Sequence, residues 1–141
     1  MKYNDTIKIL KEIKLKATPQ RIAIIEFLKE NRTHPTPRQI YDLLKKEYPS
    51  ISLATIYNTL SALKDEGIIE ELYLEKDISH IECNTTPHDH FFCLSCKKIF
   101  DIMEDKYKDD IPHTIKDFKI ISIRKEYFGY CDECVSKEGE N

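Results

Sequence analysis

Apolar side chains recur at every third or fourth position through the first half of the chain, which is the spacing of amphipathic helices. A capping threonine followed by proline precedes two of these segments, at residues 18–19 and 36–37, and Ser52 precedes another. Gly67 ends the last of them. The pattern therefore predicts four helices, with apolar faces at residues 7–13, 22–28, 40–44 and 56–63.

Two short apolar segments follow the helices, at residues 68–74 and 78–83, and are typical of a β-hairpin. Helices followed by a small hairpin predict a winged helix-turn-helix domain over residues 1–83, whose fourth helix enters the DNA major groove. The non-core side chains of that helix are able to contact phosphates or base edges, although an ordinary solvated face gives the same pattern. They are Thr55, Tyr57, Asn58, Ser61 and Lys64.

After a linker at residues 84–87, the pattern changes to short strands. Candidate strands occupy residues 91–93, 99–102 and 120–130, and a weak helical pattern lies between residues 106 and 117. An antiparallel sheet of this size is too small to be stable by itself. Residues 84–141 are therefore predicted to form a dimerisation domain that pairs with a second copy. The expected fold class is α+β, a winged helix followed by a small antiparallel sheet.

Composition and charge narrow the class of protein. The chain has 141 residues, of which 40% are hydrophobic and 33% charged, as expected for a globular protein. Its apolar runs are too short to span a bilayer, and its first residues lack the layout of a secretion signal. We therefore expect a cytoplasmic protein with no membrane partner. The net charge of −3 gives no sign of nucleic-acid binding, although Lys and Arg are frequent between residues 2 and 38.

Four of the five cysteines form two CxxC pairs, which is a common arrangement for structural zinc. Disulfides are uncommon in the cytoplasm, so paired cysteines there indicate metal before cystine. Four thiolates can surround Zn²⁺ at about 2.3 Å in a closed site, and a redox dithiol is the alternative interpretation. The predicted zinc ligands are Cys93, Cys96, Cys131 and Cys134.

Histidines and carboxylates on both sides of the linker suggest a second metal site. His88 and His90 alternate just before the first CxxC pair, so both point to one side of a strand. Asp101 lies on the next predicted strand, while His34 and Glu82 belong to the first half. Imidazoles and carboxylates suit Fe²⁺, Mn²⁺ or Zn²⁺, although a histidine pair alone is more often an ordinary surface feature.

Three further residues of metal-binding type fit no ligand spacing. Cys83 is expected to be a buried thiol, and His80 and His113 are expected to be ordinary surface histidines. The sequence contains no glycine-rich nucleophile or phosphate loop, and no Ser-His-Asp arrangement is recognisable. We therefore expect no enzyme activity and no organic small-molecule substrate.

Taken in order along the chain, these motifs resemble the ferric uptake regulator (Fur) family. The matching segments are ATPQR at 17–21, HPT at 34–36, SLATIY at 52–57, HDHFFCxxC at 88–96 and CxxC at 131–134. The resemblance implies a homodimeric, metal-dependent repressor of palindromic double-stranded DNA operators, with structural Zn²⁺ and regulatory Fe²⁺ or Mn²⁺. By motif position the regulatory ligands would be His34, Glu82, His88, His90 and Asp101, and Arg21 would join the fourth helix at the DNA.

The resemblance is strongest to the peroxide-sensing (PerR) branch. Asn58 and Asp101 match that branch, whereas Glu82 departs from it because the branch favours Asp there. The implied mechanism is a metal clamp that fixes the two winged domains, opened when peroxide chemistry at Fe²⁺ oxidises His34 or His88.

A further metal site of many iron regulators is expected to be absent. Its ligand positions here hold Pro87, Lys108 and Ile123, and Asp89 is the one donor that remains.

Other functions stay open at the level of sequence. A regulator of the same family could sense iron or zinc concentration without peroxide chemistry. From other classes, the chain could be a zinc-dependent hydrolase with Glu82 as the base, or a zinc-stabilised interaction module without a role at DNA.

Overall fold

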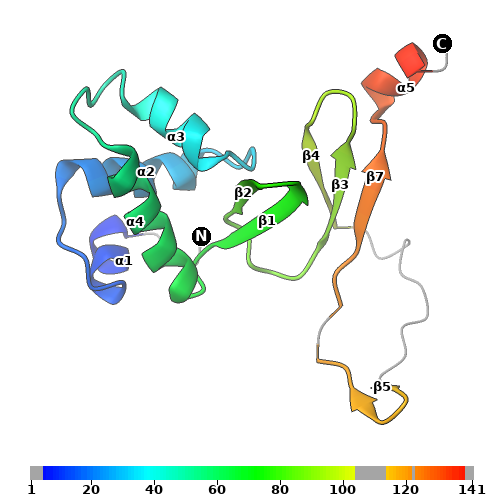
Figure 1. Cartoon of the computed structure of the whole chain (residues 1–141). Coiled ribbons are helices and arrows are strands. Elements are labelled where there is room, and N and C mark those ends of the chain that lie inside the picture. The colour runs from blue at the N-terminus through cyan, green and yellow to red at the C-terminus, as the bar shows by residue number, and fades with distance from the viewer. Residues whose placement is uncertain (1–4, 104–113, 122, 139–141) are drawn as a thin grey trace. The chain divides into compact units, whose positions relative to one another are not determined.

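The computed structural model describes residues 5–103, 114–121 and 123–138 (Figure 1). The chain divides into two compact units, Met1–Thr85 and Thr86–Asn141. No helix among the described residues is long and apolar enough to cross a membrane. The assignment of DNA binding to residues 1–83 and of dimerisation to residues 84–141 stays a prediction.

The first unit contains the four helices that the apolar pattern predicts. They are α1 (Thr6–Glu12), α2 (Pro19–Glu30), α3 (Pro37–Leu44) and α4 (Leu53–Asp65). Each begins where a side-chain oxygen accepts a hydrogen bond from a backbone N–H of the first turn. Thr18 caps α2, Ser52 caps α4, and Thr36 forms a full capping box with Gln39 at the start of α3.

Isoleucine and leucine side chains from all four helices form the core of this unit. Removing each such side chain from water contributes about 2 kcal/mol to folding, before its lost side-chain entropy is counted. Two predicted core positions are wrong, because Ile7 is 53% exposed and Leu43 is 50% exposed. The buried face of α1 contains Ile9 and Leu10, and in the first turn this face is formed by Thr6 and not by Ile7. The Thr6 hydroxyl donates a hydrogen bond to Glu26 on α2.

The predicted hairpin is confirmed as β1 (Glu70–Glu75) and β2 (Ile78–Glu82), which pair antiparallel. Asp77 in the turn has a φ of 60°, a left-handed conformation that Asp tolerates better than most residues. Leu72 and Leu74 are buried on β1, and Ile81 joins the core from β2. Four helices and this hairpin make a winged helix-turn-helix, so this part of the expected α+β fold is confirmed.

The second unit contains a three-stranded sheet in the order β4–β3–β7, formed by β3 (Asp89–Cys93), β4 (Ile99–Ile102) and β7 (Glu126–Gly129). β3 and β4 pair antiparallel, but β7 runs parallel to β3. The expectation of a purely antiparallel sheet therefore needs correction. A parallel partner needs a crossover connection of about a dozen residues or more, and residues 94–125, which include β4, connect β3 to β7.

The remaining elements of this unit differ from the expected pattern. Part of the weak helix expected at 106–117 is instead a two-stranded hairpin, β5 (Thr114–Ile115) and β6 (Phe118–Lys119), while residues 104–113 lie outside the described residues. Of the strand expected at 120–130, only residues 126–129 form β7. Helix α5 (Asp132–Glu138) was not expected, and acidic residues in its first turn favour its N-terminal end.

Candidate metal centres and DNA-facing helix

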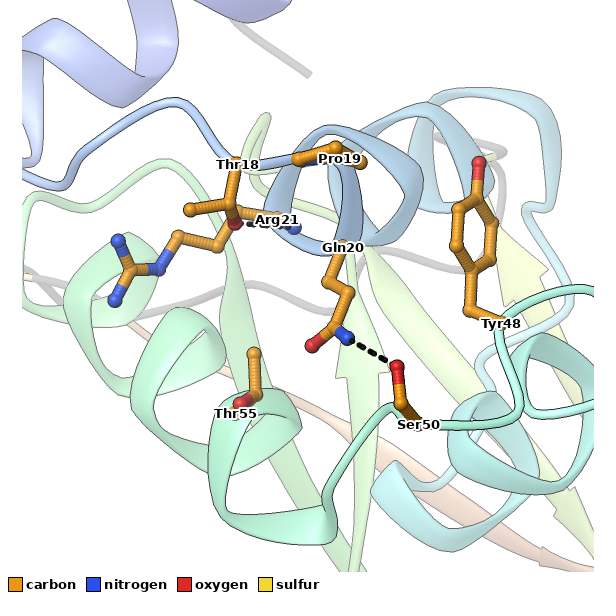
Figure 2. A pocket seen from close by; sticks show the side chains of 7 residues that line it. All are labelled: Thr18, Pro19, Gln20, Arg21, Tyr48, Ser50 and Thr55. Atoms are coloured by element: carbon orange, nitrogen blue, oxygen red, sulfur yellow. Dashed lines mark hydrogen bonds between the residues drawn. The ribbon is translucent and has the colours of Figure 1, made fainter.

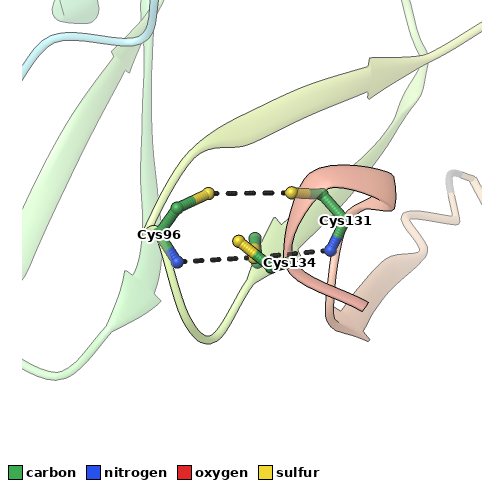
Figure 3. Close-up of side chains that lie close together, drawn as sticks. Cys96, Cys131 and Cys134 are labelled. Atoms are coloured by element: carbon green, nitrogen blue, oxygen red, sulfur yellow. Dashed lines mark hydrogen bonds between the residues drawn. The ribbon is translucent and has the colours of Figure 1, made fainter. Parts of the chain in front are cut away.

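Four cysteines of the second unit form one cluster, three of which are labelled in Figure 3. The Sγ atoms of Cys93, Cys96, Cys131 and Cys134 all lie within 4.8 Å of one another. The Sγ atoms of Cys96 and Cys131 are 3.8 Å apart. Tetrahedral Zn²⁺ with bonds of about 2.3 Å to sulfur places its ligand atoms about 3.8 Å from each other. The donor set and its spacing therefore fit a structural zinc ion.

Backbone geometry brings the two CxxC pairs together. Cys93 ends β3, and a tight turn returns the chain so that the Lys97 N–H donates to the Cys93 carbonyl at 2.9 Å. On the other side, Cys93 pairs in register with Gly129 of β7, two residues before Cys131. A Cβ at Gly129 would lie 3.3 Å from the Phe91 ring, so glycine allows the strands to approach this closely.

The electrostatics of the cluster favour a cation. Burial raises the pKa of Cys93, but hydrogen bonds from backbone N–H groups, first that of Cys131, outweigh it and lower the pKa to about 6. The neighbouring Cys131 thiol, followed by burial, raises the pKa of Cys134 to about 12. One thiolate therefore forms near neutral pH, whereas four adjacent thiolates require the charge of a bound dication.

In the first unit, His34 and Glu82 form a buried pair. His34 Nε2 lies 2.7 Å from Glu82 Oε2, and the two residues are 5% and 3% exposed. Glu82 ends β2, and its Oε1 accepts a hydrogen bond of 2.7 Å from the Asn84 N–H. Buried charged groups are costly unless paired, so this arrangement holds a carboxylate and an imidazole together in the interior.

In the second unit, two histidines converge on one carboxylate. The rings of His88 and His90 have centroids 4.5 Å apart, as expected for alternate residues at the start of a strand. Their Nε2 atoms lie 3.0 and 3.4 Å from Asp101 Oδ1, and Asp101 pairs in register with His90 across β3 and β4. Imidazole and carboxylate donors of this kind suit a regulatory Fe²⁺ or Mn²⁺.

Helix α4 presents polar side chains to solvent at the predicted DNA-contacting positions. Tyr57 is 49% exposed, and Asn58, Ser61 and Lys64 are also exposed. Thr55 is half-buried, and its hydroxyl lies 2.9 Å from that of Ser52. The DNA-contacting role of these residues stays a prediction.

A strand of the hairpin restrains one of these side chains. Lys64 Nζ lies 3.3 Å from Glu71 Oε2 on β1, and this hydrogen bond raises the pKa of Lys64. Exposed ion pairs of this kind contribute little to stability.

A hollow of about 510 Å³ lies at the N-terminal ends of α2 and α4 (Figure 2). Gln20 Nε2 donates to Ser50 Oγ at 3.2 Å across it, and Arg21 donates to the Lys16 carbonyl at 2.9 Å. Of the lining residues, Arg21 and Thr55 were predicted to contact DNA. Tyr48 and Ser50 were not, because the loop before α4 has no periodic pattern to place them, whereas Gln20 lies on α2 beside Arg21.

The predictions for Cys83, His80 and His113, which fit no ligand spacing, differ in how well they agree with the structure. Cys83 is buried as expected, and burial raises the pKa of its thiol to about 11. The interpretation of His80 as a surface residue is wrong, because it is 7% exposed and its Nδ1 lies 2.8 Å from the His34 carbonyl oxygen. Its place two residues before Glu82 was the available clue. His113 lies outside the described residues.

The positions of the further metal site, expected to be absent, are partly described. Ile123 is 42% exposed, and Asp89 lies 3.8 Å from Lys125 Nζ. Lys108 lies outside the described residues, so the absence of this site stays a prediction.

Comparisons with known proteins agree across most of the chain. A model described as the ferric uptake regulator family matches residues 12–128. The peroxide-responsive repressor PerR of Staphylococcus aureus is 37% identical over 135 residues, covering 94% of this chain and 91% of that protein.

Solved structures show the same likeness. The Helicobacter pylori ferric uptake regulator Fur, described with three functional metal-binding sites, has a TM-score of 0.72 at 26% identity and covers 96% of this chain and 97% of its own. PerR from Streptococcus pyogenes, described as a peroxide sensor and gene regulator, has a TM-score of 0.50 at 32% identity, covering 91% of this chain and 89% of its own.

Proposed function

Because this chain belongs to the ferric uptake regulator family of metal-responsive DNA-binding repressors, we propose that it represses transcription and senses peroxide through oxidation of a ligand histidine. The regulators of this family bind DNA as dimers. The peroxide-sensing part is supported by the similarity to PerR of S. aureus and by the carboxylate of Asp101 beside His88 and His90.

The proposed regulatory site combines the donors of both units. The first unit contributes His34 and Glu82, and the second contributes His88, His90 and Asp101. Neither set alone supplies more than three donor residues. A metal ion that needs both sets would favour one arrangement of the two units, and by this preference it would select the DNA-competent shape of the dimer.

Two ligand imidazoles, those of His34 and His88, are the proposed sites of oxidation. Bound Fe²⁺ would supply the reducing electron that peroxide cleavage needs, whereas Mn²⁺ would not. In the net reaction, peroxide would add one oxygen atom to an imidazole carbon and release its other oxygen as water. The ring would lose two electrons and would become a poorer metal ligand. Oxidised His34 would then bind the metal more weakly, and the two donor sets would separate.

The DNA-facing surface is proposed to be α4, with Thr55, Tyr57, Asn58, Ser61 and Lys64, together with Arg21 from α2. These groups carry hydroxyl, amide and cationic donors suited to phosphates and base edges. A palindromic operator suits the two-fold symmetry of a homodimer.

The decisive experiment is peptide mass spectrometry of protein loaded anaerobically with Fe²⁺ and then treated with near-stoichiometric peroxide. We expect one added oxygen on the peptide that contains His34 or His88. Protein loaded with Mn²⁺ is the control and should remain unmodified. In parallel, Fe²⁺-dependent binding to a duplex selected from a random library with the Mn²⁺ protein should disappear after peroxide treatment.

A second candidate function is a sensor of metal concentration, and Glu82 favours it. Its two oxygens already contact His34 and the Asn84 N–H, so the longer carboxylate is held in a defined position. A filled iron site without any histidine oxidation would contradict peroxide sensing and support this candidate. Failure of the metal-loaded dimer to bind any duplex would count against both.

A further inference from the structure

His80 is buried beside the proposed metal ligands of the first unit, although it belongs to no ligand motif. It lies on β2, two residues before Glu82, and is 7% exposed. Its Nδ1 is 2.8 Å from the backbone carbonyl oxygen of His34. A carbonyl can only accept a hydrogen bond, so this nitrogen carries the proton and donates. On its other side, Nε2 lies 3.4 Å from Glu75 Oε2 of β1.

The backbone at His34 needs such support. His34 has a φ of 56°, in the left-handed region that residues with a Cβ occupy infrequently. Conformations of this kind persist where the surroundings hold them. Pro35 follows directly, and Thr36 then caps α3, so the chain has little freedom to place His34 otherwise.

Three consecutive residues of β2 hold this segment. The His80 side chain donates to the His34 carbonyl, the Ile81 N–H donates to the Pro35 carbonyl at 2.8 Å, and Glu82 contacts the His34 imidazole at 2.7 Å. The first of these contacts fixes the peptide of the ligand residue itself. The orientation of the His34 side chain therefore depends on both its ring partner and its own carbonyl.

We propose that His80 is a positioning residue for the regulatory metal: through Glu75 and the His34 carbonyl, it holds the His34 imidazole in the orientation that a metal ion requires. The inference rests on the proposed function, because it assumes that His34 is a metal ligand. A ligand must be held within about 0.5 Å of its working geometry, and residues behind the ligands commonly decide this. His80 touches no metal in this proposal and acts through His34.

A pair of amide substitutions separates positioning from simple space filling. In His80→Asn, the side-chain amide nitrogen takes the place of Nδ1 and can still donate to the His34 carbonyl. In His80→Gln, the amide reaches the place of Nε2 and faces Glu75 instead. Both variants replace the ring with an amide. If His80 acts through packing alone, the two variants should therefore lose similar amounts of metal affinity.

The test is Mn²⁺ binding to the full-length, zinc-loaded dimer, measured by competition with a fluorescent chelator. We expect His80→Ala and His80→Gln to weaken binding by about tenfold or more, as is common for residues that support metal ligands. His80→Asn should retain most of the affinity. A second readout needs no metal: the Ile81 amide should exchange with solvent faster in the Ala and Gln variants than in the Asn variant. Zinc content and thermal unfolding monitor the fold.

The possible outcomes distinguish this inference from the proposed function. Equal Mn²⁺ affinity of the wild type and His34→Ala would overturn the regulatory site itself, and the role of His80 with it. Loss of binding in His34→Ala with wild-type affinity in His80→Ala would overturn the role of His80 alone. Equal losses in the Asn and Gln variants would also overturn positioning through Nδ1, in favour of packing. If His80→Ala fails to fold, the Asn and Gln variants still decide the question.

Discussion

Single residues near the metal centres owe their chemistry to burial and to neighbouring donors. Two cysteines illustrate this: backbone N–H groups lower the pKa of Cys93 to about 6, whereas burial raises the pKa of Cys83 to about 11. Both side chains are no more than 6% exposed. Cys93 nevertheless forms the thiolate that binds metal, whereas Cys83 stays an unreactive neutral thiol. Residue type alone does not separate these roles.

The first prediction concerns Cys83. Because its pKa lies above that of an exposed thiol, the neutral form dominates up to about pH 11 and the reactive thiolate is scarce at neutral pH. We expect iodoacetamide at pH 8 to leave Cys83 unlabelled in the native, zinc-loaded protein and to label it in denaturant. Labelling should rise only as the pH approaches 11. Peptide mass spectrometry measures it, and rapid native labelling at pH 8 would show that this thiol is not protected.

At the scale of elements, the hairpin β1–β2 does more than complete the first unit. Glu71 on β1 holds Lys64 of α4, and His80 on β2 holds His34 before α3. One two-stranded element therefore contacts both the proposed DNA-facing helix and the proposed metal ligand. Neither contact depends on the arrangement of the two units.

The second prediction follows from the Lys64–Glu71 pair. Lys64→Ala should weaken binding of the metal-loaded dimer to a random-sequence duplex and lower the slope of log affinity against log salt by about two, one for each protomer. Glu71→Gln keeps a hydrogen-bonding group beside Tyr73 but releases the Lys64 charge, so it should strengthen binding at low salt. Fluorescence anisotropy across a salt series measures both. Unchanged slopes in the two variants would place Lys64 away from the phosphates.

Elements with a periodic pattern and a cap were predictable from the sequence, and elements set by distant contacts were not. Thr36 and Gln39 mark the start of α3 locally, so the helix could be placed without its surroundings. The direction of β7 depends on pairing with β3, more than thirty residues earlier, and no local pattern records it. The four-cysteine cluster could be predicted because the spacing of its two CxxC pairs is distinctive. The contact of His80 with His34 could not be predicted, because no residue pattern around His34 indicates its left-handed backbone conformation.

For the whole molecule, the two units differ in what stabilises them. The first has a core of isoleucine and leucine side chains from four helices, whereas the core cluster around the metal site of the second consists of Cys93, Cys131 and Cys134 with Phe91 against it. Zinc binding to these cysteines would contribute to the folding free energy of the second unit. The two metals would therefore have separate roles. Zinc would stabilise the fold of the second unit, and the regulatory metal would control DNA binding.

The last prediction tests that separation. Cys96→Ser should abolish zinc binding, because a serine hydroxyl replaces one of four thiolates, and should unfold the sheet of the second unit. Structural zinc commonly contributes about 10–16 kcal/mol at neutral pH, far more than so small a sheet provides by itself. The helices of the first unit should persist, since their core contains no cysteine ligand. Far-ultraviolet circular dichroism should keep most of its helical signal, while zinc content and the dimer seen by analytical ultracentrifugation are lost. Cys83→Ser is the matched control outside the cluster and should keep its zinc and remain a dimer. A stable, zinc-free dimer of Cys96→Ser would show that the second unit folds without the metal.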